Sequence, residues 1–294
     1  MAITMAKLED EFDEGDELTV SGVSLEEYIL NHRIIWTQTN VYGNPSVCIK
    51  KLLDENIINP SNSKRKVNSV SYKAPSDSRI TSMRIESQYT GDGLYDAISD
   101  ICITAKIGMK LTLDTTRTSM IFSLYHGEDL SFSQMSNAFV LFSPSLENIL
   151  DSKYIIDMTK YGNVALTAGE GEGTARKTVV VGDSSLADLN RREIFVDARD
   201  ISSTGPNNTK IPPDKYLKNL ESRGKTKLIE AQTIEAFDGE ISDHSIYKYG
   251  IDYNIGDIIQ IENAYGKSLS VRISEYIWSV DGSGTKEYPT LIKI

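Results

Sequence analysis

The spacing of apolar residues changes near residue 126, and this change limits what the chain can fold into. Before it, apolar residues recur at helical spacing, for example at Leu94, Ile98 and Ile101. After it, short runs of β-branched and aromatic residues are separated by turn residues, which is typical of strands. We therefore predict an α+β protein in three parts: an acidic arm and first strand at 1–20, an α/β lobe at 21–126, and a mostly β region at 127–294.

Three helices are expected in the lobe. Their starts are marked by residues that cap helices: Ser24 in a capping box with Glu27, Asn44 before Pro45, and Asp92. The second helix is expected to stop at Asn59–Pro60 and the third at Gly108. Residues 61–78 are polar and rich in turn formers, which predicts a surface loop. Alternating apolar residues at 109–113 and 120–124 predict an antiparallel strand pair packed on the helices.

The region after residue 126 is predicted to be mostly β. A short strand is also expected earlier, at 18–22. The later strands are expected at 137–142, 163–168, 177–181, 192–198, 226–236, 257–262, 267–280 and 285–293. One helix interrupts them near 213–223, opened by Pro212–Pro213 and closed by Gly224. Trp36 and Trp278 are isolated in the sequence and are assigned to the core by default.

The charge balance excludes several classes of protein. The 294 residues include 42 acidic and 31 basic side chains, a net charge of -11. An acidic chain is poorly suited to gripping phosphate backbones, because that affinity comes from Lys and Arg. Seven carboxylates and one lysine among residues 1–20 indicate a solvated arm and argue against a signal peptide. No apolar run approaches the length of a membrane-spanning helix, so no membrane anchor is predicted.

A glycine-rich segment after an expected strand invites comparison with nucleotide-binding loops. Gly169, Gly171 and Gly173 are separated by single residues, but neither the third dinucleotide-binding glycine nor a following Gly-Lys-Ser/Thr is present. Glu170 and Glu172 would also repel a phosphate. We predict a tight turn with positive φ angles, and no cofactor.

Residue patterns for catalysis or metal binding are weak. There is no G-x-S-x-G, H-E-x-x-H or paired C-x-x-C motif. The histidines His32, His126 and His244 lie far apart in the sequence, and His126 with Asp129 is the best acid–base fragment. Cys48 and Cys102 cannot form a disulfide framework. We predict no catalytic residue and no metal site, although no chain with 42 acidic residues excludes a catalytic carboxylate pair.

Alternating charges surround the expected strand at 194–196. They are Arg191, Arg192 and Glu193 before it and Asp197, Arg199 and Asp200 after it. Two interpretations stay open. One is a half-buried strand with salt-bridged ends, and the other is a subunit contact, where arginine is favoured because its planar fork pairs carboxylates at two points.

A further signal lies in the order of several short segments along the chain. They are 18–26 (LTVSGVSLE), 33–35 (RII), 55–60 (ENIINP), 169–176 (GEGEGTAR), 191–193 (RRE), 196–200 (VDARD) and 249–257 (YGIDYNIGD). In this order they resemble the tail proteins of siphophages and prophages that belong with the baseplate-hub, or tail-associated, proteins.

The resemblance implies a structural protein. Hub proteins form a trimer whose two related barrel-like β domains make a pseudo-sixfold ring, which adapts the sixfold tail tube to a threefold tip and lets DNA pass. The implied fold is thus a set of ring-forming β domains with an inserted α/β lobe, here 21–126. Residues 252–257 would start a ring strand, with 272–275 in the next one. Relatives carry a longer β segment before residue 18, so the first ring domain is expected to be incomplete or completed by a neighbour.

We therefore expect a non-enzymatic tail-tip or baseplate-hub subunit located in the virion tail. Its expected partners are further copies of itself, as a homotrimer, and a distal tail or tube ring protein, with DNA passing through the lumen without specific binding. A tail-borne cell-wall hydrolase and a host-surface binding module are the alternatives. The turn and interface candidates are Gly169, Gly171, Gly173, Arg176, Arg191, Arg192, Glu193, Asp197, Arg199, Asp252, Gly256 and Asp257.

Overall fold

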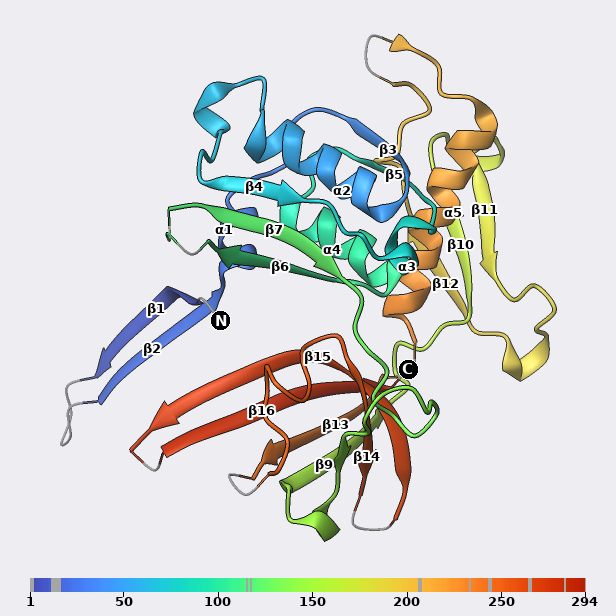
Figure 1. The fold of residues 1–294 in the computed structure, drawn as a ribbon. Helices are drawn as coiled ribbons and strands as arrows, with labels where there is room; N and C mark the ends of the chain where they lie inside the picture. The colour runs from blue at the N-terminus through green and yellow to red at the C-terminus, as the bar shows by residue number, and fades with distance from the viewer. Residues whose placement is uncertain are drawn as a thin grey trace. The chain divides into compact units, whose positions relative to one another are not determined.

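The computed structural model describes residues 3–11, 17–114, 116, 118–205, 208–232, 234–242, 245–263, 266–282 and 284–293 (Figure 1). The chain forms two compact units that interleave along the sequence. Unit 1 comprises Met1–Tyr125, Val164–Leu186 and Glu193–Ile229, and unit 2 comprises His126–Asn163, Ala187–Arg192 and Glu230–Ile294. Each is described by itself below.

The chain of unit 1 starts with a two-stranded hairpin. Strand β1 (Ile3–Glu11) pairs antiparallel with β2 (Glu17–Ser24), in a register that places Ile3 opposite Ser24 and Glu11 opposite Glu17. The strand expected at 18–22 therefore exists. The acidic residues before it are not an arm that precedes the first ordered element, since Glu9, Asp10 and Glu11 belong to β1.

The helices of the lobe begin largely where their caps predict. Helix α1 (Leu25–Leu30) follows Ser24, whose Oγ accepts a 3.4 Å hydrogen bond from the Glu27 N–H. Helix α2 (Pro45–Leu53) follows Asn44, whose side chain accepts from the Val47 N–H at 3.0 Å, and a π-helical turn (Asp54–Ile58) extends it to Asn59.

The third lobe helix, α4 (Leu94–Ala105), differs from the prediction at both ends. Gly93 occupies the N-cap position, while Asp92 accepts a hydrogen bond from the Thr90 N–H at 2.8 Å instead. Lys106 ends the helix in the left-handed conformation at φ 52°, two residues before the expected Gly108. The expected inner face is confirmed, because Leu94, Ile98, Ile101 and Ala105 are all buried.

Two small sheets complete the lobe. Strands β3 (Thr39–Gly43) and β5 (Ile85–Tyr89) pair antiparallel. In the other sheet, β7 (Met120–Tyr125) lies between β6 (Gly108–Leu113) and β4 (Val70–Lys73), antiparallel to the first and parallel to the second. The expected β6–β7 pair is confirmed. The loop predicted at 61–78 is wrong in part, because it contains β4 and the start of a short helix, α3 (Ser78–Thr81).

A second layer of unit 1 consists of a three-stranded sheet and a long helix. Strand β10 (Val164–Ala168) lies between β11 (Thr178–Gly182), to which it is antiparallel, and β12 (Glu193–Asp197), to which it is parallel. These strands confirm the predictions at 163–168, 177–181 and 192–198.

Helix α5 (Pro213–Glu230) is longer than predicted, because Gly224 lies inside it. A Cβ on Gly224 would come within 2.3 Å of Thr167 Oγ1 and 2.8 Å of Val181 Cγ2, so this glycine allows the helix to approach the sheet. The predicted strand at 226–236 is wrong over its first half, which is helical to Glu230.

Unit 2 is built on one six-stranded sheet in the order β8-β14-β15-β16-β13-β9. Its strands are β8 (Leu141–Phe142), β9 (Ile149–Asp157), β13 (Ile234–Ile241), β14 (Ile258–Glu262), β15 (Ser268–Asp281) and β16 (Gly284–Lys293). The two edge strands, β8 and β9, follow each other directly in the sequence. The sheet therefore curls into a nearly closed barrel (Figure 1).

The barrel encloses its own core. The fully buried side chains include Phe142, Tyr253, Ile259, Ile261, Ile273 and Leu291. Strands predicted at 257–262, 267–280 and 285–293 are confirmed, and only the last two residues of the strand predicted at 137–142 pair in the sheet. Short 3₁₀ turns occur at Ser63–Arg65, Pro144–Leu146, Gly173–Ala175 and Asp188–Asn190. The predicted fold class, barrel-like β structure with an α/β lobe, is confirmed.

Candidate interaction surfaces

The glycine-rich segment forms a tight turn, as predicted. Gly171 has φ 98° and Gly173 φ 52°, both in the region that favours glycine. Gly169 serves a different purpose, because a Cβ there would come within 2.2 Å of the Tyr216 hydroxyl oxygen. That hydroxyl accepts a 2.8 Å hydrogen bond from the Glu170 N–H, which fixes the turn to α5. Gly169 and Tyr216 thus hold the turn against the helix.

Arg176, at the end of this turn, connects three chain segments. Its Nε donates to Gly169 O and its Nη2 to Ala168 O, each at 2.9 Å. The same Nη2 donates to Asp197 Oδ1 at 2.6 Å. Its guanidinium also lies 5.5 Å from the ring centroid of Phe195. The structure therefore brings together three predicted residues, Gly169, Arg176 and Asp197.

Asp197 accepts from two arginines. Arg199 Nη2 donates to Asp197 Oδ2 at 2.6 Å, and Arg199 Nε contacts both carboxylate oxygens at 3.0 Å. The hydrogen bonds from Arg199, followed by those from Arg176, hold the pKa of Asp197 down at about 2. The Arg176 side chain is only 20% exposed, whereas that of Arg199 is 67% exposed, so Arg199 presents a cation to solvent beside the pair.

An exposed apolar row crosses the outer face of this sheet. The register places Leu166 opposite both Val180 and Phe195. Their exposed fractions are 40%, 53% and 61%, respectively. Because these three apolar side chains are adjacent and exposed, the row is a candidate interaction surface. The residues of this row were not singled out from the sequence, because their contact depends on strand register.

The second predicted turn, at 252–257, is a polar cap on the barrel. Asp257 is 6% exposed, and its two carboxylate oxygens accept from the Glu128 and Asn254 N–H groups, each at 2.7 Å. Burial raises the pKa of Asp257 above its ordinary value. Gly256 has φ 92°, and Asp252 accepts from the Lys248 N–H at 2.8 Å. These three residues shape the turn into β14.

Gly256 also links this turn to β15. Its carbonyl accepts a 2.7 Å hydrogen bond from Arg272 Nη1. Arg272 pairs with Ile258 of β14 in the sheet register. Residues 272–275 therefore lie in β15, the strand after the one that this turn starts, as expected.

Three further predicted residues, Arg191, Arg192 and Glu193, lie at or just before the start of β12. Arg192 lies 5.7 Å from the ring centroid of Tyr161, and its N–H donates to Asn163 Oδ1 at 2.8 Å. Arg191 follows the 3₁₀ turn at Asp188–Asn190, and Glu193 begins β12. The salt bridge of Asp197 agrees with the interpretation of a strand with salt-bridged ends. The subunit contact stays a prediction, and Phe195 is exposed in this chain.

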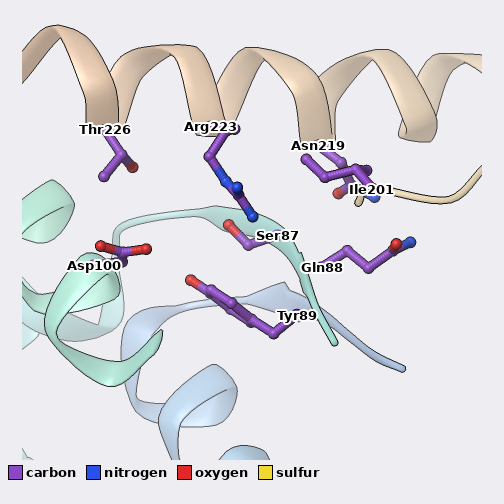
Figure 2. Close-up of a pocket in the computed structure, with 8 residues that line it drawn as sticks. All are labelled: Ser87, Gln88, Tyr89, Asp100, Ile201, Asn219, Arg223 and Thr226. Carbon is purple, nitrogen blue, oxygen red and sulfur yellow. The ribbon is translucent and has the colours of Figure 1, made fainter. Parts of the chain in front are cut away.

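Unit 1 also contains a small polar cavity between α5, β5 and α4 (Figure 2). Ser87, Tyr89, Asp100, Asn219 and Arg223 are among the residues that line it. The space measures about 10 Å³, room for about one water molecule and far below the size of a substrate pocket. Asn219 is 1% exposed, and neither polar atom of its side chain has a hydrogen-bond partner in the described part of the chain.

Hydrogen bonds join α5 to the lobe around this cavity. Ser222 Oγ lies 3.0 Å from Ser87 Oγ, and Thr226 Oγ1 lies 3.1 Å from Thr104 Oγ1. Because the core of the lobe and the core under α5 are separate apolar clusters, these polar contacts hold the two layers together.

Comparison with known proteins identifies the family of this chain. Residues 1–291 match the family described as Siphovirus ReqiPepy6 Gp37-like protein. The chain belongs to this family. The curated proteins contain no match to the sequence.

Two solved structures have a fold similar to that of this family member. One is the 43 kDa tail protein of prophage MuSo2 from Shewanella oneidensis, at 12% identity and a TM-score of 0.54, covering 98% of this chain and 78% of that one. The other is a tail protein from Neisseria meningitidis MC58, at 15% identity and a TM-score of 0.57, covering 100% and 80%. The predicted resemblance to phage and prophage tail proteins is confirmed.

The two members of the predicted acid–base fragment of this family member, His126 and Asp129, make separate hydrogen bonds. His126 Nδ1 lies 2.7 Å from Gly127 O, whereas Asp129 accepts from the Ser131 N–H at 2.9 Å and from its hydroxyl at 2.7 Å. His244 lies outside the described residues. Burial raises the pKa of both Cys48 and Cys102 to about 12, so neither thiol is activated.

The described residues contain no cluster of three or more potential metal ligands. None of the helices in the described ranges is both long and apolar enough to cross a membrane. The assignment of both tryptophans to the core is wrong, because the side chain of Trp36 is 60% exposed and that of Trp278 is 54% exposed.

Proposed function

We propose that this protein is a non-enzymatic structural component of a phage or prophage tail tip or baseplate hub, located in the virion tail. The observation that carries this proposal is the family match over residues 1–291, supported by a fold similar to that of two tail proteins. Its barrel-like sheet and α/β lobe are the parts that a hub subunit of this kind requires.

In this proposal three copies form a closed ring that caps or extends the tail tube and adapts sixfold to threefold symmetry. The neighbouring partner is a distal tail or tube ring protein. Self-association is supported by the row Leu166, Val180 and Phe195, which leaves apolar surface unburied in a single copy. Arg199 and Asp197 at the edge of this row add charged groups suited to the rim of an interface.

The charge of the chain fits passage of DNA through such a ring. Three copies carry 3 × -11, or -33, charges. A negative lumen repels the phosphate backbone, so DNA slides through it instead of binding. A ring structure with a neutral or basic channel lining would remove this argument and leave the fold unaffected.

The oligomeric state tests the proposal. Light scattering coupled to size-exclusion chromatography, over a wide concentration range, should reveal a closed trimer. A monomer at every concentration, both alone and with the tube ring protein, would overturn the ring. Release of muropeptides from cell walls would favour a hydrolase instead, and affinity of the isolated protein for cell-wall polysaccharide would favour a host-surface module.

A further inference from the structure

The lobe carries a cationic surface that is unusual in this acidic chain. Lys64, Arg65 and Lys66 are the one run of three consecutive cations in the sequence. Arg33 Nε donates to Arg65 O at 3.1 Å, which places a fourth cation beside this run. We call these four residues, with the exposed Trp36, the basic patch.

Trp36 and Asn56 hold the Arg65 side chain in place. Its guanidinium lies 4.4 Å from the ring centroid of Trp36. Its Nη2 donates to Asn56 Oδ1 at 3.0 Å and to Ile34 O at 2.5 Å. Asn56 is itself buried, and its Nδ2 donates to Leu52 O at 2.9 Å. A cation fixed by an indole ring and a buried amide is preorganised, so an anion that binds it loses little entropy in ordering it.

These contacts leave the charge of Arg65 uncompensated. Both acceptors of its Nη2 are neutral groups, a backbone carbonyl and a side-chain amide, and over the described ranges neither its Nε nor its Nη1 has an acceptor. Burial, followed by the charge of Arg33, lowers the pKa of Arg65 below its ordinary value, because both disfavour the cation. An anion bound to the open N–H groups would oppose both effects.

The chain supplies no such anion among its described residues. None of the four cations of the basic patch forms an ion pair with a described carboxylate, whereas the nearby Lys50 pairs with Asp54. The sequence holds 42 acidic side chains, so a cluster of four cations without one is exceptional in it. The basic patch is therefore open to an anion from outside the chain.

The surroundings of Arg65 favour a protein as the source of that anion. Its planar fork binds a carboxylate or a phosphate at two points. Beside it, the side chains of Trp36 and Ile34 are 60% and 50% exposed, and this apolar area suits a segment with apolar residues among its acids. A nucleic acid is the less suitable occupant, because four cations on a chain of net charge -11 give weak attraction for a polyanion.

We infer that the basic patch binds an acidic segment of a neighbouring tail protein. The fork of Arg65, with Arg33 beside it, takes one carboxylate of the segment. Lys64 and Lys66 attract the acids that flank it, and Trp36 contacts an apolar side chain between them. That the partner is a tail protein rests on the proposed function, whereas the acidic character of the segment rests on the basic patch alone.

The fluorescence of Trp36 tests this inference directly. The chain contains two tryptophans, so Trp278→Phe leaves Trp36 as the single indole emitter. The probe is a synthetic peptide of Glu-Glu-Leu repeats, and its neutral control is the same peptide with glutamine in place of glutamate. We expect a saturable change in Trp36 emission with the acidic peptide alone, weakened by added salt. No change with the acidic peptide, or equal changes with both peptides, would overturn the inference.

Charge reversal separates the basic patch from the general charge of the chain. Lys64→Glu with Lys66→Glu should lower the affinity for the acidic peptide by about tenfold or more. The matched control is Lys73→Glu with Lys110→Glu, two exposed lysines that pair with Ser123 from neighbouring strands and make the same change in net charge. The control should lower the affinity by less than about twofold, because these lysines lie beyond the patch. Equal losses would show that the peptide follows net charge, and the inference would be wrong.

Two further results distinguish this inference from its alternatives. If a DNA duplex changes Trp36 emission at a lower concentration than the acidic peptide does, the basic patch is a nucleic-acid site and the inference is wrong. If the protein forms a trimer but does not bind the acidic peptide, the inference fails and the proposed function stands. If the acidic peptide binds but the protein stays a monomer even with the tube ring protein, the ring fails and the acidic-segment site stands.

Discussion

Arg176 donates a 2.6 Å hydrogen bond to Asp197 across 21 residues of sequence, and this contact joins the glycine-rich turn to the end of β12. Arg199 binds the same carboxylate from the other side. The sequence analysis treated the glycine-rich turn and the charged residues around β12 separately, but in the structure they form one cluster. The cluster makes the stability of unit 1 depend on pH in a defined direction.

Asp197→Asn should remove a pH-dependent part of that stability. The pKa of Asp197 is about 2 in the folded protein, against an ordinary 3.8, so its contribution is complete above pH 3.8 and is lost as the pH falls towards 2. Melting temperatures of wild type and variant should therefore differ above pH 5 and converge as the pH approaches 2. Asp188→Asn, at an exposed position, controls for the loss of one charge. A gap that stays constant down to pH 2 would contradict the assigned role.

Gly127→Ala should destabilise the barrel. A Cβ at Gly127 would lie 1.9 Å from Gly256 O and 2.8 Å from Asp257 N, and backbone atoms can yield only if the turn moves. We expect a loss of about 1–3 kcal/mol in the free energy of unfolding, measured by urea denaturation. Gly282→Ala is the matched control, because a Cβ there meets no atom within 4 Å. Equal effects of the two substitutions would show that the close contact is absent.

Asp257→Ala should also weaken unit 2, for a different reason. It leaves the N–H groups of Glu128 and Asn254 without their acceptor at a site that is 6% exposed. Each unsatisfied buried donor costs about 1–3 kcal/mol, so the loss of the acceptor for two donors should cost about 2–6 kcal/mol in total. Asp252→Ala, which removes one acceptor from the Lys248 N–H in the more exposed part of the same turn, should cost less than half as much. Urea denaturation of the three proteins gives the comparison.

The sequence predicted those features that depend on neighbouring residues. Ser24 and Asn44 cap helices because their acceptors are three residues from the N–H groups they bind. Gly224 was misread as a helix end because its real function, a close approach to Thr167 and Val181, depends on a sheet more than forty residues earlier in the chain. A glycine after an amphipathic run fits both a helix end and a close approach between a helix and a sheet, so the sequence does not distinguish them.

The candidate surfaces were predictable only as far as they are local. The positive φ angles of Gly171 and Gly173 follow from their own turn. The row of Leu166, Val180 and Phe195 depends on the order and register of three strands, which alternation within each strand does not specify. Trp36 was assigned to the core from its residue type, yet its ring lies against Arg65 at the surface.

Phe195→Asp should impair assembly and leave the fold intact. The side chain is 61% exposed in the single copy, so a carboxylate there remains hydrated and costs little folding free energy. In a trimer that buries the apolar row, the same carboxylate would be desolvated without a partner, and we expect the association constant to fall at least tenfold. Ile251→Asp, at a side chain that is 76% exposed on unit 2, is the matched control. Light scattering should show the loss for Phe195→Asp alone, with unchanged urea midpoints for both variants. An unaltered trimer would place the proposed interface elsewhere on the molecule.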